Sequence, residues 1–170
     1  MRRVALIFAL AVLFALPAFS QNDYKAEVFG GYQYTRVEGE SFNGWNAAVT
    51  GNVNNWLGIT GDISGGYKSV GGVKVKVHNF LFGPTVSYNQ YEKVKPFAHV
   101  LFGVSHASGS VDGIGGASDN AFAMALGGGL DVGVHSNVAF RLVQVDYLMT
   151  RFGSQTQNNA RISTGIVFRF

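Results

Sequence analysis

Residues 158–170, NNARISTGIVFRF, alternate between two kinds of side chain. One set of alternate positions is apolar apart from a threonine, and it comprises Phe170, Phe168, Ile166, Thr164 and Ile162. The other set is small or charged apart from a valine, and it comprises Arg169, Val167, Gly165, Ser163 and Arg161. A period of two predicts a β-strand with one apolar and one polar face. A transmembrane β-barrel needs such strands, with apolar side chains toward lipid and polar ones toward the lumen. An edge strand of a soluble β-sandwich is the alternative.

The other end of the chain has the features of a cleavable signal peptide. Arg2 and Arg3 form a basic start, residues 4–16 are apolar, and Ala18 and Ser20 occupy the two small positions of a cleavage site. The apolar run is shorter than the ~20 residues that a transmembrane helix needs. We expect cleavage after Ser20, which leaves residues 21–170 as one outer-membrane β-barrel domain. An uncleaved anchor is the alternative.

The composition argues against several classes of function. Charged residues make up 14% of the chain, well below the ~25% of ordinary soluble domains. The 13 basic residues fall to 11 once Arg2 and Arg3 are removed, against 10 acidic residues. This near-neutral balance gives no support for nucleic-acid binding. The chain has no cysteine, so disulfide and thiolate chemistry are absent. We expect no cofactor.

Turn signals divide the mature chain into eight strand-like segments, the smallest number in the usual bacterial series. The predicted strands are residues 24–35, 44–53, 56–68, 73–88, 95–105, 121–134, 138–150 and 158–170. Short turns at 54–55, 89–93 and 135–137 alternate with mostly longer loops at 36–43, 69–72, 106–120 and 151–157. Short periplasmic turns and longer extracellular loops alternate in this way in outer-membrane barrels. Both chain ends are then expected on the periplasmic side.

The segment of residues 73–88 has a conflict in its alternation. Lys74, Lys76 and His78 share the parity of the apolar residues that follow them. Either these three lie beyond the lipid boundary, or a β-bulge shifts the face. We prefer the first interpretation, because a lysine at mid-membrane costs ~2–4 kcal/mol. Pro84 predicts a local irregularity, because proline cannot donate to a β-ladder.

The segment of residues 138–150 has one residue on the wrong face. Gln144 and Asp146 share the polar face, and Val145 and its alternate neighbours lie opposite. Arg141 falls on the apolar parity. We therefore expect either a position near the membrane edge or a bulge within this strand.

The whole mature chain resembles the small eight-stranded outer-membrane barrels of the OmpA transmembrane domain and OmpX type. The resemblance rests on RLVQVDYLMTRF at residues 141–152 and on the ending GIVFRF at 165–170. It implies an all-β fold: an eight-stranded antiparallel up-and-down transmembrane β-barrel in the bacterial outer membrane. It also implies a monomer whose partners are outer-membrane lipids and lipopolysaccharide. In these families the terminal strand is read by the barrel-assembly machinery, and Gly165, Phe168 and Phe170 match that signal.

Charged residues on the predicted lumen face form a candidate polar network. They are Glu27, Asp62, Asp131, Asp146, Arg161 and Arg169. Unpaired charges would be costly there, so opposite signs should meet. The network either fills the barrel or lines a narrow ion path, and we favour filling because eight strands leave room only for side chains. Glycines such as Gly127 and Gly129 are expected to make that room.

Enzymatic and metal sites receive little support. The four histidines show no metal-ligand spacing, so we expect no metal site. His106 and Ser108 have the His-x-Ser spacing of barrels that deacylate lipid A, with Asp112 or Asp119 as a possible third group. However, Gly109 stands where that family has asparagine. The leading hypothesis is a barrel with a structural or surface-interaction role, the alternative is a small pore for ions or solutes, and a lipid A-modifying enzyme comes third.

Overall fold

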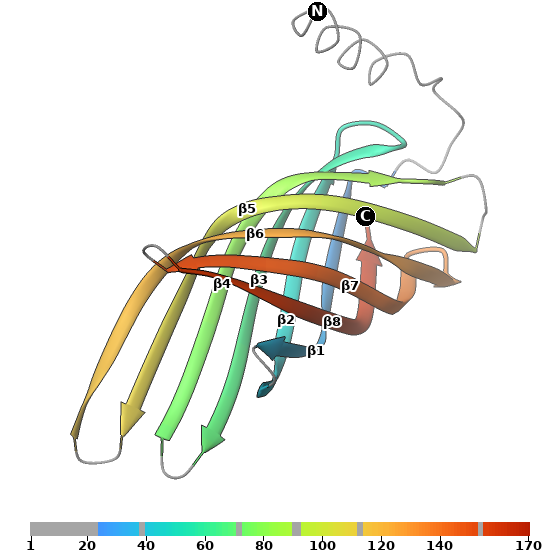
Figure 1. Cartoon of the computed structure of the whole chain (residues 1–170). Helices are drawn as coiled ribbons and strands as arrows, with labels where there is room; N and C mark the ends of the chain where they lie inside the picture. Colours follow the sequence, from blue (N-terminus) through green and yellow to red (C-terminus); the bar gives the residue numbers. More distant parts are fainter. Residues whose placement is uncertain (1–23, 38–39, 71–72, 90–92, 112–113, 153–154) are drawn as a thin grey trace, which may run out of the picture.

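Eight antiparallel strands form a closed β-barrel in the computed structural model, which describes residues 24–37, 40–70, 73–89, 93–111, 114–152 and 155–170 (Figure 1). The strands are β1 Ala26–Val37, β2 Glu40–Asn52, β3 Leu57–Val70, β4 Val73–Ser87, β5 Val94–Val111, β6 Ile114–His135, β7 Val138–Phe152 and β8 Gln155–Arg169. Each strand pairs with the next, and β1 pairs with β8 to close the barrel. The predicted signal peptide lies outside the described residues.

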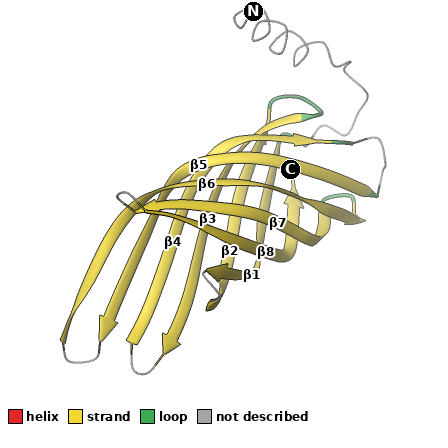
Figure 2. Ribbon diagram, in the orientation of Figure 1, coloured by secondary structure: helices red, strands yellow, loops and turns green. Residues whose placement is uncertain are grey.

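The described residues form strands, turns and short connections only (Figure 2). None of them belongs to a helix long and apolar enough to cross a bilayer. Backbone hydrogen bonds between the C-terminal residue and residues at or just before the start of β1 complete the closure of the barrel. The amide of Phe170 donates to Ala26 O at 2.9 Å, and Lys25 N donates to Phe170 O at 2.6 Å.

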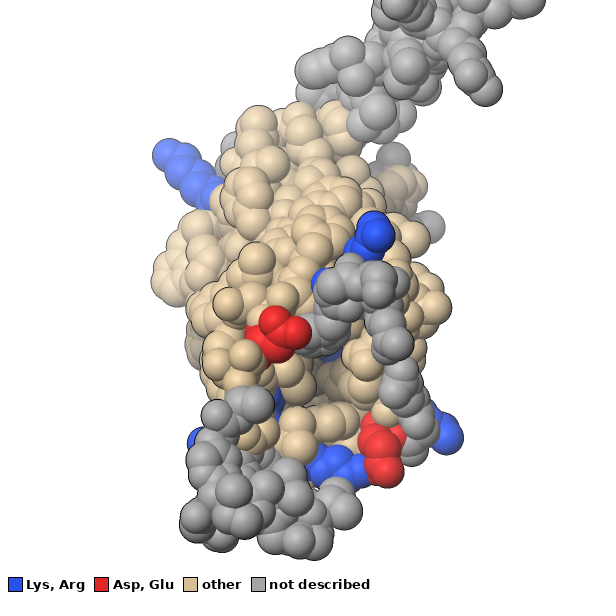
Figure 3. Space-filling model, turned by 60° about the vertical axis from the view of Figure 1, so that its left-hand side comes forward, with Lys and Arg blue, Asp and Glu red and all other residues tan. Residues whose placement is uncertain are grey.

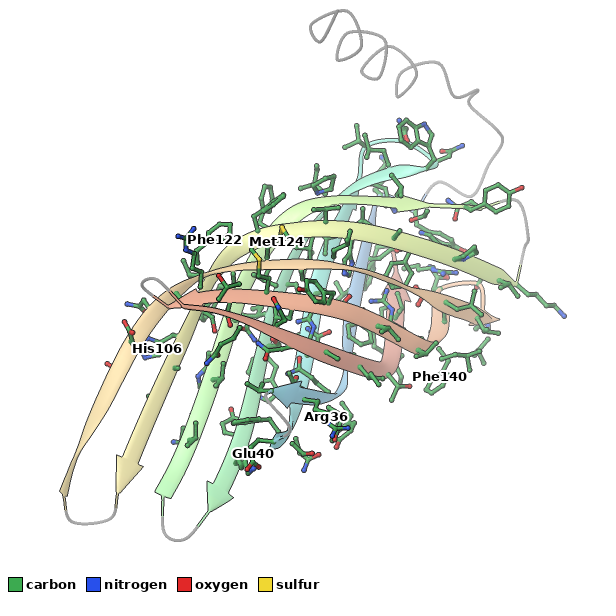
Figure 4. The ribbon with its side chains drawn as sticks, in the orientation of Figure 1. Arg36, Glu40, His106, Phe122, Met124 and Phe140 are labelled. Atoms are coloured by element: carbon green, nitrogen blue, oxygen red, sulfur yellow. The ribbon has the colours of Figure 1, made fainter. Side chains whose placement is uncertain are left out.

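The alternation of apolar and polar faces predicted from the sequence is confirmed. In β4, Phe82 is 64% exposed on the outside of the barrel, whereas the adjacent Leu81 is 3% exposed in the lumen. Phe122 of β6 and Phe140 of β7 also point away from the barrel wall (Figure 4). Apolar side chains cover the outer surface because it faces lipid.

The predicted long loops are wrong, because the strands continue through most of them. The described residues of the segment 106–120, predicted as the longest loop, belong to the end of β5 and the start of β6, which pair from His106↔Asn120 to Val111↔Ile114. The predicted loops 36–43 and 151–157 are likewise mostly strand. Beyond the lipid, both faces of a strand contact water. The period-two signal then disappears although the hydrogen-bonded ladder goes on.

The barrel wall is much taller on one side than on the other. β6 has 22 residues, about twice the ~9–11 that span a bilayer. Its pairing with β7 begins at Phe122↔Arg151, so among the described residues 114–121 pair with β5 alone. We call residues 68–70, 73–75, 106–111 and 114–121 the outer sheet. Figure 1 shows the β3–β4 and β5–β6 hairpins extending beyond the rest of the wall.

The conflict in β4 is resolved without a bulge. β4 keeps a continuous register with β3 from Leu57↔Val86 to Val70↔Val73. Lys76 is exposed and pairs with Ser108 of the outer sheet. On the β5 side, pairing skips Gly83 and Pro84 and resumes in the same register. The irregularity expected at Pro84 is therefore an interruption of the ladder.

Arg141 reaches the lumen through a β-bulge in β7. The register with β8 shifts between Arg141 and Gln144. Leu142 and Val143 consequently both face lipid, whereas Arg141 and Gln144 are 8% and 1% exposed. Of the two interpretations of this residue, the bulge is confirmed.

Candidate functional site

The lumen contains three zones along its axis. Near the chain ends lies a group of charged side chains, which we call the inner cluster: Glu27, Lys95, Asp131, Arg141 and Arg169. The middle zone is the Arg161 layer, formed by Asp62, Ser64, Leu101, Asp146 and Arg161. Toward the outer sheet lies a cavity lined by neutral side chains, which we call the outer cavity.

Arg161 joins three strands in the middle of the barrel. It comes from β8, and its Nη1 donates to Asp62 Oδ1 of β3 at 2.7 Å. Its Nε donates to Asp146 Oδ2 of β7 at 2.8 Å. Arg161 and Asp146 are fully buried, and Asp62 is 3% exposed. One guanidinium between two carboxylates leaves a net negative charge, so further donors are needed around it.

Three neighbouring side chains contact the two carboxylates. Asn46 Nδ2 donates to Asp62 Oδ2 at 2.8 Å, and Gln144 Nε2 donates to Asp146 Oδ2 at 2.8 Å. His99 Nε2 lies 2.7 Å from Asp146 Oδ1. Each carboxylate therefore receives several hydrogen bonds, as a buried charge requires.

A glycine makes the Asp146 site possible. Gly127 pairs with Asp146 across β6 and β7. A Cβ at Gly127 would collide with Asp146 Oδ1, and one at Gly129 would lie 2.8 Å from the Phe97 ring. The expectation that these glycines make room for larger lumen side chains is confirmed.

The inner cluster contains two separate ion-paired groups. Arg141 makes a bidentate contact with Asp131, with Nε–Oδ1 at 2.7 Å and Nη2–Oδ2 at 3.1 Å. Its guanidinium also stacks between two rings, 4.3 Å from Phe29 and 4.2 Å from Phe97. Planar guanidinium groups suit both contacts. Glu27 Oε1 pairs with Lys95 Nζ at 2.7 Å and with Arg169 Nε at 3.2 Å.

All six residues of the predicted network are buried in the lumen. The structure brings Asp62, Asp146 and Arg161 together and places Glu27 beside Arg169. Asp131 is not paired with a predicted residue, because its partner is Arg141.

Sequence reasoning missed two cations of the inner cluster. Lys95 is the first residue of the predicted strand 95–105 and shares the parity of Phe97 and His99, so its position could have been found from the alternation. Arg141 could not be placed, because no residue in that strand marks the bulge before its register is known.

The Arg161 layer lies between two cavities of the lumen that are lined by described residues. The inner cavity holds only ≈20 Å³, and the outer cavity holds ≈320 Å³. They share no lining residue. Between them lie Arg161, Asp146 and Leu101, each without accessible surface, and Leu81 at 3%. Leu81 and Leu101 pack with Leu148 and two alanines of β6 beside the polar groups.

The residues of the possible deacylase site do not come together. His106 has the parity of the lipid-facing residues of β5, and its Nδ1 lies 2.7 Å from Asn120 Oδ1. Asp119 pairs with Ala107, which lines the outer cavity, so Asp119 has the opposite parity. Asp112 lies outside the described residues. Within the described parts of the chain, no three His, Cys, Asp or Glu side chains could hold a metal ion together.

Two residues of the predicted assembly signal, Gly165 and Phe168, lie on β8, and Phe170 follows directly after it. Phe168 and Phe170 are exposed on the outer surface. Gly165 pairs with Gly31 of β1 at the barrel closure, where a Cβ on Gly165 would lie 2.5 Å from Gly31 Cα. This close approach of the two strands requires glycine at that position.

Comparison with known proteins gives a consistent architecture. A family model described as the outer membrane protein beta-barrel domain matches residues 6–170. Ail, the attachment invasion locus protein of Yersinia pestis, superposes with a TM-score of 0.61 at 20% identity, covering 85% of this chain and 97% of that one.

Two further solved structures are similar. Neisserial surface protein A superposes with a TM-score of 0.64 at 14% identity, covering 85% and 96% of the two chains. OprG from Pseudomonas aeruginosa superposes with a TM-score of 0.53 at 11% identity, covering 85% of this chain and 95% of that one. At these identities the likeness concerns the fold. No curated protein matches the sequence.

Proposed function

Because this chain belongs to the outer membrane protein β-barrel domain family and is an integral barrel of the bacterial outer membrane, we propose that it works as a sealed barrel that presents a surface for interaction. Two features support the proposal. The first is the closed middle of the lumen, and the second is the tall outer sheet.

The closed Arg161 layer is the observation that carries the proposal. A permeation path would have to pass Arg161, Asp146 and Leu101, none of which has accessible surface. Both carboxylates are held by the guanidinium and by amide donors. Opening this layer would break several buried charged hydrogen bonds at once, which is strongly unfavourable. We therefore expect the protein to interact with its partners at the ends of the barrel and not to transport solutes through it.

The outer sheet provides the surface. Residues 114–121 of β6 pair with β5 on one edge, and within the described parts of the chain β7 pairs with β6 only from Phe122 onward. Ser118, Asp119 and Asn120 of this segment are exposed. A strand edge of this kind can pair with an added extended polypeptide. An attachment role is the one named for the structurally similar Ail, and a surface role of that kind fits this geometry.

Single-channel recording tests the sealed lumen. The protein is purified from the outer membrane in detergent and added to a planar lipid bilayer under an applied voltage. We expect no stepwise conductance above that of a bilayer treated with detergent alone. Regular steps from the wild-type chain would contradict the proposal. Heat-dependent mobility in gel electrophoresis confirms in parallel that the added protein is a folded barrel.

A narrow pore is the second candidate function, and one observation favours it. Cavities lie on both sides of the Arg161 layer, so a rearrangement of that single layer would join them. In this case the same recording should show conductance that changes when Arg161 is replaced.

A further inference from the structure

We infer that the outer cavity is a binding site for a neutral polyhydroxylated molecule the size of a monosaccharide. This inference goes beyond the proposed function, because the cavity lies outside the Arg161 layer and would bind its ligand whether or not that layer conducts. The argument rests on the size of the cavity, its lack of charge and its unpartnered polar atoms.

The size and position of the cavity suit a small ligand. Its volume of ≈320 Å³ falls within the ~300–1,000 Å³ of small-molecule pockets. Val37, the last residue of β1, and Gln157 of β8 line its outer part, so the cavity lies at the hairpin end of the barrel. Figure 3 brings this end forward and shows a mostly uncharged surface with a few charged side chains around it. The cavity therefore lies on the side of the Arg161 layer that is away from the chain ends.

Five buried polar atoms that line the cavity have no hydrogen-bond partner. They are Gln33 Oε1, Thr35 Oγ1, Asn79 Oδ1, Ser105 Oγ and Asn159 Oδ1. Each of these side chains is at least nine-tenths buried. Buried polar groups in native proteins are normally paired, so five such atoms around one space, contributed by four strands, indicate a partner that occupies that space.

The unpartnered atoms are mostly acceptors. Asn79 Nδ2 already donates to Ser64 Oγ at 3.1 Å, and Asn159 Nδ2 donates to Thr150 Oγ1 at 3.4 Å. Their amide oxygens are therefore the free atoms, and they require a ligand that donates hydrogen bonds. The hydroxyls of Thr35 and Ser105 can either donate or accept. A molecule with several hydroxyl groups meets all five requirements.

The lining also excludes charged ligands. None of the described side chains that line the outer cavity is ionisable, so a buried anion or cation would have no counter-charge. The inner cavity differs, since it is lined by Glu27, Lys95 and Asp131 among others. Apolar surface from Phe42 and Leu148, which are 9% and 3% exposed, completes the outer cavity. The C–H faces of a sugar ring pack well against such side chains.

The test uses isotopically labelled protein, purified from the outer membrane in a detergent without a sugar headgroup. D-glucose is the neutral probe, and glucosamine and glucuronate are its charged counterparts. We expect saturable shifts of the side-chain amide NMR signals of Gln33, Asn79 and Asn159 on adding glucose. Both charged sugars should bind at least tenfold more weakly. Absence of saturable shifts with glucose, or equal binding of glucosamine or glucuronate, would overturn the assignment.

Matched serine variants locate the site. Ser105→Ala removes a hydroxyl that has no protein partner and should weaken glucose binding about three- to tenfold, the effect of one neutral hydrogen bond. Ser163→Ala is the control, because Ser163 is also buried with an unpartnered hydroxyl but does not line the cavity. Ala107→Phe should fill the cavity and abolish binding. Equal weakening by Ser105→Ala and Ser163→Ala, or undiminished binding by folded Ala107→Phe protein, would also overturn the inference.

Discussion

The inner cluster and the outer cavity lie in the same lumen, yet they differ in the charge of their buried polar groups and in the space left between them. In the inner cluster and the Arg161 layer, each carboxylate contacts at least one cation, and the space left over is ≈20 Å³. In the outer cavity the polar groups are neutral, five of their atoms are unpartnered, and the free space is ≈320 Å³.

The difference follows from what each group costs when it is buried alone. An unpaired buried charge is far more costly than an unpaired amide or hydroxyl. Charged side chains must therefore reach across the lumen to their partners, and in doing so they fill it and connect distant strands. Neutral side chains impose no such requirement, so the outer half can keep an open space. We expect stability to reside mainly in the inner half and binding in the outer half.

The largest loss of stability should follow Arg161→Ala. Asp62 and Asp146 would remain buried without their shared cation, which typically costs ~3–5 kcal/mol. The free energy of unfolding, measured by denaturant titration in detergent micelles, should fall by about that amount. The control adds Asp62→Asn and Asp146→Asn to the same chain, and it should recover a large part of the loss. An Arg161→Ala barrel as resistant as the wild type would contradict the role of this layer.

A smaller loss is expected for Arg141→Lys, which keeps the charge. Lysine cannot reproduce the bidentate contact with Asp131 or the stacking between Phe29 and Phe97. We expect the free energy of unfolding to fall by ~1–3 kcal/mol. Arg36→Lys is the matched control, since Arg36 is exposed near the β1–β2 connection (Figure 4), and it should change stability by less than ~0.5 kcal/mol. Similar effects at the two positions would show that charge alone matters at Arg141.

Arg169→Ala tests the weaker of the inner ion pairs. Arg169 Nε lies 3.2 Å from Glu27 Oε1, and Lys95 Nζ remains 2.7 Å from the same oxygen. Because Glu27 keeps one cation, the loss should be ~1–2 kcal/mol, below that of Arg161→Ala. Asp119→Ala in the exposed outer sheet is the comparison, with an expected change under ~0.5 kcal/mol. Equal denaturant resistance of the two variants would refute a stabilising contact for Arg169.

The sequence predicted the membrane-facing parts of the fold well, because lipid on one face and a polar lumen on the other impose strict alternation. Phe82 and Leu81 lie on the faces that their parity indicates. The prediction failed where lipid ends. At residues 106–120, Gly, Ser and Asp indicated a loop, whereas β5 and β6 continue to pair from His106↔Asn120 to Val111↔Ile114.

The charged network could be predicted only in part. Parity alone was enough to place Asp62, Asp146 and Arg161 on the lumen face, but not to choose their partners, which depend on the register of strands far apart in the sequence. Arg141 shows the limit most clearly, because a bulge reverses its parity. The outer cavity was not predicted, since a space between side chains leaves no periodic pattern.

The smallest expected difference in stability is between alanine variants of two buried serines, one in the Arg161 layer and one in the outer cavity. Ser64 and Ser105 are both fully buried. Ser64 Oγ accepts hydrogen bonds from Arg161 Nη1 at 3.2 Å and from Asn79 Nδ2 at 3.1 Å, whereas Ser105 Oγ has no partner. Ser64→Ala should therefore cost ~1–2 kcal/mol of unfolding free energy, and Ser105→Ala less than ~0.5 kcal/mol. Equal losses in the same denaturant titration would mean that the unpartnered groups of the outer half contribute to stability after all, and that the two halves do not differ in the way their contacts indicate.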